Sequence, residues 1–238
     1  MIKRAIVTGS SRGIGKTIAA TLNRAGWDII NLDRSPPHDT NIRYIEVDLT
    51  DADALSRTLD EIISEGPVTG LVNNAGIAIA ATLEETTPED FDTTVAINMK
   101  APMMLAKALV PGMKAQGFGR IVNISSRAHL GKTHRTAYSA TKGGILSMGR
   151  VWALEYARDG ITVNTIAPGP IRTELFDLAN PPEMPRTAEI IDTIPVGRVG
   201  LPDDIANAAR FFMDENSSYV TGQTLYVCGG ITLARGGS

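Results

Sequence analysis

The sequence is poor in cysteine, in aromatic residues and in excess charge of either sign. Cys228 is the single cysteine among 238 residues, which excludes an internal disulfide and a cluster of cysteine ligands for a metal. The net charge of −3 and the absence of a basic run argue against nucleic acid as a partner. No apolar stretch is long enough to span a membrane. We therefore expect no metal, nucleic-acid or membrane site.

Length and composition predict one globular domain over residues 1–238. The chain is 43% hydrophobic and 21% charged, which is typical of an ordinary α/β domain with a substantial core. We find no internal repeat, low-complexity tract or domain boundary. Residues 1–7 lead directly into an expected strand, so we expect no signal peptide. A lone cysteine suits a reducing compartment, and we expect a cytoplasmic protein.

Short apolar, β-branched runs alternate with longer amphipathic stretches, and this order is typical of parallel α/β folds. Only a proline-containing loop at 35–41 fits between the second and third runs, so no crossover helix is expected there. The residues expected to form strands are 6–8, 27–32, 44–49, 70–72, 119–124, 161–166 and 224–227.

A glycine-rich turn follows the first expected strand. Gly9, Gly13 and Gly15 precede a helical pattern that stops at Gly26. Glycines at such a turn let backbone N–H groups approach a pyrophosphate at the start of a helix. The alternative is a turn that only connects two elements, but the flanking strand and helix favour dinucleotide binding.

An acidic residue, Asp33, ends the second expected strand about 20 residues beyond the glycine turn, where a carboxylate binds ribose hydroxyls. A carboxylate there repels a 2′-phosphate and favours NAD over NADP. Arg34 and Arg12 both lie close in sequence to these elements and could pair with such a phosphate, so NADP stays open.

Two further strand ends face the same expected crevice. Asp48 and Leu49 end the third expected strand, where an adenine ring could lie, although Asp48 could instead cap the next helix. The run Asn73-Asn74-Ala75-Gly76 follows the fourth strand, and its small residues leave room for a ligand.

Tyr138 and Lys142 are four residues apart, so on a helix they share one face. A nearby ammonium group favours the phenolate form of a tyrosine, and such a pair can move protons near neutral pH. The alternative is a chance pair at the edge of a helix.

Polar residues elsewhere are ambiguous when taken alone. Asn98 lies among apolar neighbours, and a buried amide there serves either a backbone hydrogen bond or catalysis. Ser125 and Ser126 end the fifth strand and either terminate it or face the crevice. His129 and His134 are expected at the surface of the following loop, with a role in the substrate pocket as the alternative.

Taken together, these residues resemble the short-chain dehydrogenase/reductase family in its compact form, over nearly the whole chain. The matching motifs are Thr8-Gly9-x-x-x-Gly13-x-Gly15, Asn73-Asn74-Ala75-Gly76, Asn98, Ser126, Tyr138-x-x-x-Lys142 and Pro168-Gly169. The resemblance implies a Rossmann-type, doubly wound three-layer sandwich with a seven-stranded parallel sheet. It also implies a homotetramer.

The resemblance implies a catalytic role for four residues. Tyr138 would be the general acid or base at the substrate oxygen, and Lys142 would lower the pKa of Tyr138 and bind the nicotinamide ribose. Ser126 would hold the carbonyl or hydroxyl group of the substrate. Asn98 would hold a water or a distorted helix backbone that relays protons from Lys142.

It further implies that Ile171 and Thr173 contact the nicotinamide amide and that Asn74 and Ala75 contact the adenosine ribose region. The expected cofactor-binding residues are Gly9, Ser11, Arg12, Gly13, Ile14, Gly15, Asp33, Arg34, Asp48, Leu49, Asn74, Ala75, Gly76, Tyr138, Lys142, Pro168, Gly169, Ile171 and Thr173.

Three features depart from the family pattern. The segment after Asp33 is short, Gly70 stands where an aliphatic residue is usual, and Cys228 stands where an aspartate commonly precedes Gly-Gly. None of them belongs to the catalytic set.

The expected function is hydride transfer between NAD and a secondary alcohol or ketone, a small molecule. Two alternatives stay open: an NADPH-dependent reductase of 3-oxoacyl thioesters on acyl carrier protein, and a nucleotide-sensing protein without catalysis. The substrate itself depends on loop 127–136 and on a proline-containing segment at about 174–195, which we expect to be a mobile loop over the crevice.

Overall fold

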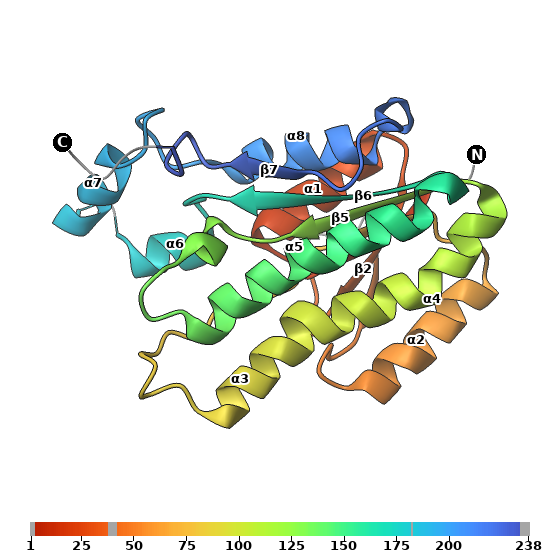
Figure 1. Ribbon diagram of the computed structural model, residues 1–238, viewed down its shortest axis with the longest axis horizontal. Helices are drawn as coiled ribbons and strands as arrows, with labels where there is room; N and C mark the ends of the chain where they lie inside the picture. Colours follow the sequence, from red (N-terminus) through yellow and green to blue (C-terminus); the bar gives the residue numbers. More distant parts are fainter. Residues whose placement is uncertain (1–2, 38–41, 182, 234–238) are drawn as a thin grey trace.

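The computed structural model describes residues 3–37, 42–181 and 183–233. Seven parallel strands form one sheet in the order β3-β2-β1-β4-β5-β6-β7 (Figure 1). This confirms the expected Rossmann-type, doubly wound architecture. The strands are β1 (Arg4–Thr8), β2 (Asp28–Asp33), β3 (Arg43–Glu46), β4 (Gly70–Asn73), β5 (Gly119–Ile124), β6 (Ile161–Pro168) and β7 (Thr224–Val227).

Helices cover both faces of the sheet because the strand residues point alternately to either side. In β1, Ile6 belongs to one apolar cluster, while Ala5 and Val7 belong to the other. The face of Val7 carries α1 (Gly13–Arg24) and α8 (Pro202–Met213), and the face of Ile6 carries α2 (Ala52–Ser64), α4 (Ala101–Gln116) and α5 (Thr136–Tyr156) (Figure 1).

The strand order reverses beside β1, which pairs with β2 on one side and with β4 on the other. In open parallel sheets a crevice forms at such a switch point, beyond the carboxyl ends of the strands. The glycine turn and Asn74 follow strands that end at this edge, and Asp33 is the last residue of β2 there, so the topology brings them together.

The link from β2 to β3 contains no helix in its described part, residues 34–37 and 42, as expected. His38, in the same link, lies outside the described residues. The shorter connection leaves the β3 end of the sheet thinly covered. Accordingly, no residue of β3 is buried.

The helical region before β5 has three consecutive parts. It consists of α3 (Pro88–Val95), a π-helical turn, η1 (Ala96–Lys100), and α4. Thr87 caps α3 through its hydroxyl, which accepts from the Asp90 N–H at 3.1 Å. The π-helical turn matters because it contains Asn98.

The segment at 174–195 is not a plain loop, so that expectation was wrong in its local structure. It contains α6 (Glu174–Ala179) and α7 (Pro185–Asp192). Pro185 occupies the first turn of α7, where proline is tolerated because that turn needs no N–H donor from it. Thr173 caps α6 by accepting from the Phe176 N–H at 3.2 Å.

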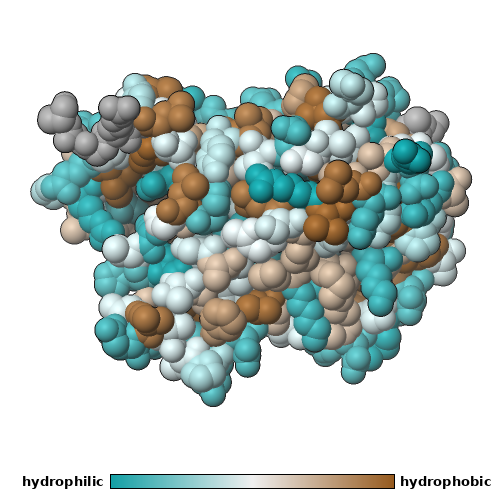
Figure 2. Space-filling view, in the orientation of Figure 1, coloured by the Kyte–Doolittle hydropathy of each residue, from teal (hydrophilic) through white to brown (hydrophobic). Residues whose placement is uncertain are grey.

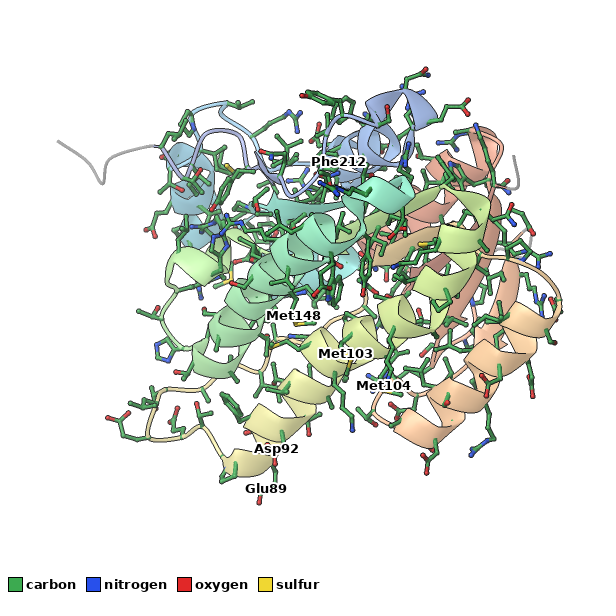
Figure 3. All side chains as sticks on the ribbon, turned by 45° about the vertical axis from the view of Figure 1, so that its right-hand side comes forward. Glu89, Asp92, Met103, Met104, Met148 and Phe212 are labelled. Atoms are coloured by element: carbon green, nitrogen blue, oxygen red, sulfur yellow. The ribbon has the colours of Figure 1, made fainter. Side chains whose placement is uncertain are left out.

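The outer face formed by α4 and α5 is partly apolar. Met103, Val151 and Leu154 are 39%, 49% and 85% exposed, whereas Ile145 and Ala153 of α5 are buried. Figure 3 labels Met103 on α4 and Met148 on α5, and Figure 2 shows apolar residues scattered among polar ones over this face. A homotetramer stays a prediction, and this face suits a contact between copies.

Among the residues described here, no helix has both the length and the apolar character that crossing a membrane requires.

The unusual Gly70 has a packing reason that leads to a prediction. A Cβ atom at this position would lie 2.7 Å from side-chain atoms of Ala5, Trp27 and Met213. Gly70→Ala is therefore expected to lower the free energy of unfolding by about 1–3 kcal/mol through overpacking. Urea unfolding followed by circular dichroism measures it. Gly112→Ala is the control, since a Cβ there meets no atom within 4 Å; equal losses in both variants would contradict the explanation.

Candidate active site

The glycine turn packs tightly against the residues that follow β4. Gly9 has φ +65°, and a Cβ atom on it would lie 2.9 Å from the Ala75 Cα. A Cβ atom on Gly15 would overlap the Gly9 carbonyl oxygen. Only glycine permits this conformation and this close approach, so the sequence pattern leads directly to a bare backbone surface at the start of α1.

Side chains from neighbouring strands hold this turn in place. Asn74 donates its amide to the carbonyl oxygens of Thr8 at 2.9 Å and Gly9 at 3.0 Å. Asn31 accepts from the Ser10 N–H at 3.1 Å. Because the Asn74 amide nitrogen already bonds the turn, an adenosine contact by Asn74 would fall to its other polar atoms and stays a prediction.

A cavity of about 410 Å³ opens at the switch point. Its volume and its bare glycine wall suit a dinucleotide. The predicted cofactor residues that line it are Gly9, Arg12, Asp33, Arg34, Asp48, Leu49, Asn74, Ala75 and Gly76. The lining residues that sequence reasoning missed are Leu32, Val47, Thr50, Ile77, Thr93 and Ile97; most of them are apolar neighbours of predicted positions.

Asp33 is engaged by the protein itself. Its two carboxylate oxygens accept from the Ser11 N–H at 3.1 Å and the Ser35 N–H at 3.3 Å. Arg12 and Arg34 are exposed at the same cavity, and neither belongs to any ion pair between described residues. The cavity wall thus carries two guanidinium groups that form no ion pair, alongside the carboxylates of Asp33 and Asp48.

Asp48 does not cap the next helix, because Asp51 does so. The Asp48 carboxylate instead accepts from the backbone and hydroxyl of Thr50, both at 2.8 Å. These hydrogen bonds, with a smaller contribution from Arg34, hold the pKa of Asp48 below its usual value.

The remaining predicted cofactor residues lie around the glycine turn and beyond β6. Thr173 lies beside the turn, since a Cβ on Gly13 would be 3.6 Å from its methyl group. Ile171 is only 7% exposed and forms a parallel bridge with Gly200, which leaves its own backbone N–H and C=O for an amide. Gly169 packs closely on Cys228. Ser11, Ile14, Gly15 and Pro168 do not line the cavity.

Ser126 and Tyr138 meet at the end of β5. The Ser126 side chain lies close enough to the Tyr138 phenol to affect its pKa, and the Ser126 Oγ accepts from the Ala128 N–H at 3.1 Å. Ser125 points elsewhere, donating its hydroxyl to the Lys142 carbonyl at 2.7 Å. The geometry therefore favours Ser126 over Ser125 as the serine that faces a substrate.

Lys142 is buried, at 5% exposure, and its Nζ donates to the Ile124 carbonyl oxygen at 2.8 Å. The Nζ lies 5.7 Å from the centre of the Tyr138 ring. Burial lowers the pKa of Lys142 to about 8. The Lys142 amino group thus lies close to the Tyr138 ring, and its pKa lets it gain or lose a proton near pH 8.

Burial is the largest influence on the pKa of Tyr138 in this structure, and the lowering expected from Lys142 stays a prediction. Burial raises the pKa of Tyr138 above its usual value, because the charged phenolate loses water. The nearby Ser126 side chain and the charge of Arg135 oppose this rise. Arg135, three residues before Tyr138, is a contributor that the four-residue spacing could not reveal.

Asn98 is buried in the π-helical turn. Its amide exchanges two hydrogen bonds with the backbone of Ile77, both at 3.0 Å, and donates to the Thr141 hydroxyl at 3.0 Å. Thr141 in turn donates to the Tyr138 carbonyl at 2.9 Å. Thr141 lies inside the Tyr138–Lys142 motif and was missed because its side chain gives no chemical signal by itself.

The two halves of the site meet at Gly76. A Cβ atom there would lie 3.1 Å from the Asn98 Oδ1 and 3.2 Å from the Lys142 Nζ. A dinucleotide in the cavity would therefore reach the Ser126–Tyr138–Lys142 group. This arrangement defines a nicotinamide-dependent oxidoreductase of the Rossmann class, in which a proton donor stands beside a dinucleotide site.

The comparisons agree with that class. A family model described as Enoyl-(Acyl carrier protein) reductase matches residues 9–232. The chain belongs to the short-chain dehydrogenase/reductase family and is an NAD(P)-dependent oxidoreductase.

Two relatives match nearly end to end. The (2S)-[(R)-hydroxy(phenyl)methyl]succinyl-CoA dehydrogenase subunit BbsD of Thauera aromatica is 35% identical, over 98% of this chain and 97% of its own. The acetoacetyl-CoA reductase of Shinella zoogloeoides is 36% identical, over 97% and 98%.

Two solved structures also match over nearly their whole length. The gluconate 5-dehydrogenase of Burkholderia cenocepacia, in complex with NADP and tartrate, has a TM-score of 0.89 and 32% identity, over 98% of this chain and 96% of that one. The aldohexose dehydrogenase of Thermoplasma acidophilum has a TM-score of 0.92 and 30% identity, over 99% and 96%.

The buried Lys142 generates a prediction about stability and pH. Its pKa falls from 10.5 in the unfolded chain to about 8 in the fold, so between these values the unfolded chain binds more protons. Stability of the wild type therefore gains from this group as pH rises through that window. The free energy of unfolding of the wild type should therefore rise, relative to that of Lys142→Met, by on the order of 3 kcal/mol between pH 7.5 and 10.5.

Urea unfolding of the cofactor-free protein at both pH values measures this difference. The control is Lys107→Met, at an exposed position of α4. A stability difference between Lys142→Met and wild type that stays constant with pH would contradict the depressed pKa.

Proposed function

We propose that this enzyme interconverts a secondary alcohol and a ketone, with Tyr138 as the general acid and base at the substrate oxygen. The observation that carries the proposal is that the Ser126 side chain lies close enough to the Tyr138 phenol to oppose the rise of its pKa, while Lys142 lies beside Gly76 of the cavity wall. Two hydroxyl groups that converge in this way can bind one substrate oxygen together. A sensor without catalysis needs neither group.

The bound nicotinamide would accept or donate the hydride. The protein would supply the proton, because the Tyr138 phenol donates to the carbonyl oxygen in reduction and removes the hydroxyl proton in oxidation. Ser126 would hold that oxygen through its own hydroxyl. Lys142 and Asn98 lie behind the phenol, where they can return a proton from solvent.

The substrate we propose carries a negative charge. Lys132 lies in the loop between Ser126 and Tyr138, and partial desolvation followed by the charges of Arg135, Arg127 and Arg186 lowers its pKa. Two segments thus bring cations to one side of the site: the loop 127–136 and α7, which contains Arg186. None of the ion pairs between described residues includes these four cations. An anionic group of a substrate could replace water around them.

The names of the relatives fit a charged substrate. Acetoacetyl-CoA carries phosphate groups, and gluconate carries a carboxylate. Both a 3-oxoacyl thioester and a sugar acid therefore remain candidates, and both need reaction at an oxygen-bearing carbon. The cations favour either of these over a neutral alcohol or ketone.

For the cofactor we propose NADP(H), in place of the NAD that Asp33 predicted. The gluconate 5-dehydrogenase structure holds NADP. In this chain Asp33 is bound to two backbone N–H groups, whereas Arg12 and Arg34 line the cavity and belong to no ion pair between described residues. The cavity wall carries two guanidinium groups and two carboxylates, those of Asp33 and Asp48, and the guanidinium groups are the ones that can pair with a 2′-phosphate.

A substrate panel tests the proposal. Acetoacetyl-CoA, gluconate, the neutral ketone 2-butanone and the enoyl thioester crotonyl-CoA are followed by nicotinamide absorbance with both cofactors. We expect turnover of a charged oxo or hydroxy substrate, with kcat/KM at least about 10-fold above the neutral ketone, and none of crotonyl-CoA. Tyr138→Phe should lower kcat by about 10²–10⁴-fold without changing the Kd of NADPH.

Undiminished turnover in Tyr138→Phe would refute the proton role. Turnover of crotonyl-CoA alone would assign the enzyme to reduction of a carbon–carbon double bond instead. A preference for 2-butanone would refute the charged substrate.

The cofactor proposal has its own test. Arg12→Ala with Arg34→Ala should raise the Kd of NADPH by about 10–100-fold and leave that of NADH nearly unchanged, because only NADPH offers the 2′-phosphate. Titration of the quenching of protein fluorescence measures both constants. Arg57→Ala, at an exposed position of α2, is the matched control. Equal losses for the two cofactors, or tighter binding of NADH in the wild type, would restore the prediction of NAD.

A further inference from the structure

His129 lies in the 3₁₀ turn η2 (Arg127–Leu130), between Ser126 and Tyr138 in sequence. The surface position expected for it was wrong, since the ring is half-buried and both of its nitrogens are bonded. Its Nδ1 is 2.6 Å from the Ser126 carbonyl oxygen, and its Nε2 is 2.7 Å from the Tyr226 hydroxyl. The two rings also pack, with centroids 5.5 Å apart.

The partners of His129 decide which nitrogen carries the proton. A backbone carbonyl oxygen can only accept, so the Nδ1 must carry a hydrogen and donate to Ser126. In the neutral ring the Nε2 is then an acceptor, and the Tyr226 hydroxyl donates to it. If the ring is protonated, the Nε2 donates to the Tyr226 oxygen instead, so both hydrogen bonds survive.

Ser126 depends on this turn for its geometry. Its carbonyl accepts from both the N–H and the ring of His129, at 3.2 and 2.6 Å. Its hydroxyl accepts from the Ala128 N–H at 3.1 Å. The orientation of the Ser126 hydroxyl toward Tyr138 is therefore coupled to the place of the His129 ring.

Tyr226 anchors the ring to the sheet. It belongs to β7, and its backbone pairs with Ala167 of β6. The hydrogen bond from Tyr226 to His129 therefore ties the edge of the sheet to a turn 97 residues earlier in the chain. Beyond His129 the loop from Leu130 to His134 is exposed, so this bond is a firm point in an otherwise open segment.

We infer that His129 and Tyr226 form a positioning pair that holds the Ser126 hydroxyl beside Tyr138 during catalysis. The inference rests on the proposed function, because Ser126 must bind the substrate oxygen for its position to matter. Neither ring needs to touch the substrate. Small displacements of a group that binds the reacting oxygen cost rate, since a misplacement of about 1 Å can cost about 10²-fold.

Tyr226→Phe removes one hydroxyl and keeps the ring packing. We expect kcat to fall by about 10-fold on the best substrate of the panel, with the Kd of NADPH and the urea midpoint nearly unchanged. His129→Asn should cost about as much as Tyr226→Phe, because its amide can replace the Nδ1–H at Ser126 but cannot reach Tyr226. The two changes together should cost little more than either one.

The decisive measurement repeats Tyr226→Phe in a Ser126→Ala background. If the pair acts by placing the Ser126 hydroxyl, removing that hydroxyl should abolish the effect of Tyr226→Phe on kcat. An equal loss of kcat in both backgrounds would overturn the inference, since a general structural effect does not depend on that hydroxyl. Tyr219→Phe, at a fully exposed tyrosine, is the matched control and should change nothing.

A second measurement needs no turnover. Nitrogen-15 NMR of His129 near neutral pH should show a protonated Nδ1, and Tyr226→Phe should shift the Nε2 signal. A ring protonated only at Nε2 would overturn the inference even if no substrate reacts. If no substrate is turned over while the NMR result is as expected, the proposed function fails and the positioning role, which rests on it, falls with it. An unchanged kcat in Tyr226→Phe refutes the inference alone.

Discussion

The buried ammonium group of Lys142 fastens the catalytic helix to the central strand, and the rest of the site depends on that attachment. Its Nζ bonds the Ile124 carbonyl, while Ser125 bonds the Lys142 carbonyl in return. This pair of contacts fixes the height of α5 above the end of β5. Tyr138, one helical turn earlier, then meets Ser126, which follows the same strand. The cost is a buried charge, seen in the lowered pKa of Lys142.

The parallel sheet supplies the second constraint. All seven strands end at one edge in the same sense, so polar residues after β1, β2, β4 and β5 converge although they are far apart in sequence. The order reversal beside β1 opens a cavity there. Gly76 lies where the cavity reaches Asn98 and Lys142, and any side chain at that point would fill the gap. Cofactor binding and proton transfer are thus parts of one continuous site.

Much of this was readable in the chain, and the failures have identifiable causes. The glycine turn could be predicted because only glycine tolerates the backbone at Gly9. The raised pKa of Tyr138 could not be predicted, because the four-residue spacing to Lys142 does not show how deeply the phenol is buried. The helices within 174–195 were missed because the prolines of that segment favoured a loop, whereas Pro185 begins α7. His129 was placed at the surface because its partner, Tyr226, is 97 residues away.

The sequence by itself determined the order of elements, the parallel sheet, the bare backbone turn, and the identity of the groups that can move a proton. These follow from local preferences, which act over a few residues and need no knowledge of distant partners. The tertiary structure decided how those groups are used. It buries Lys142, places Ser126 beside Tyr138, bonds the Asp33 carboxylate to backbone N–H groups, and bonds His129 to Tyr226. Each of these depends on which distant atoms pack together and how much water they exclude. The spacing of residues along the chain does not give that information.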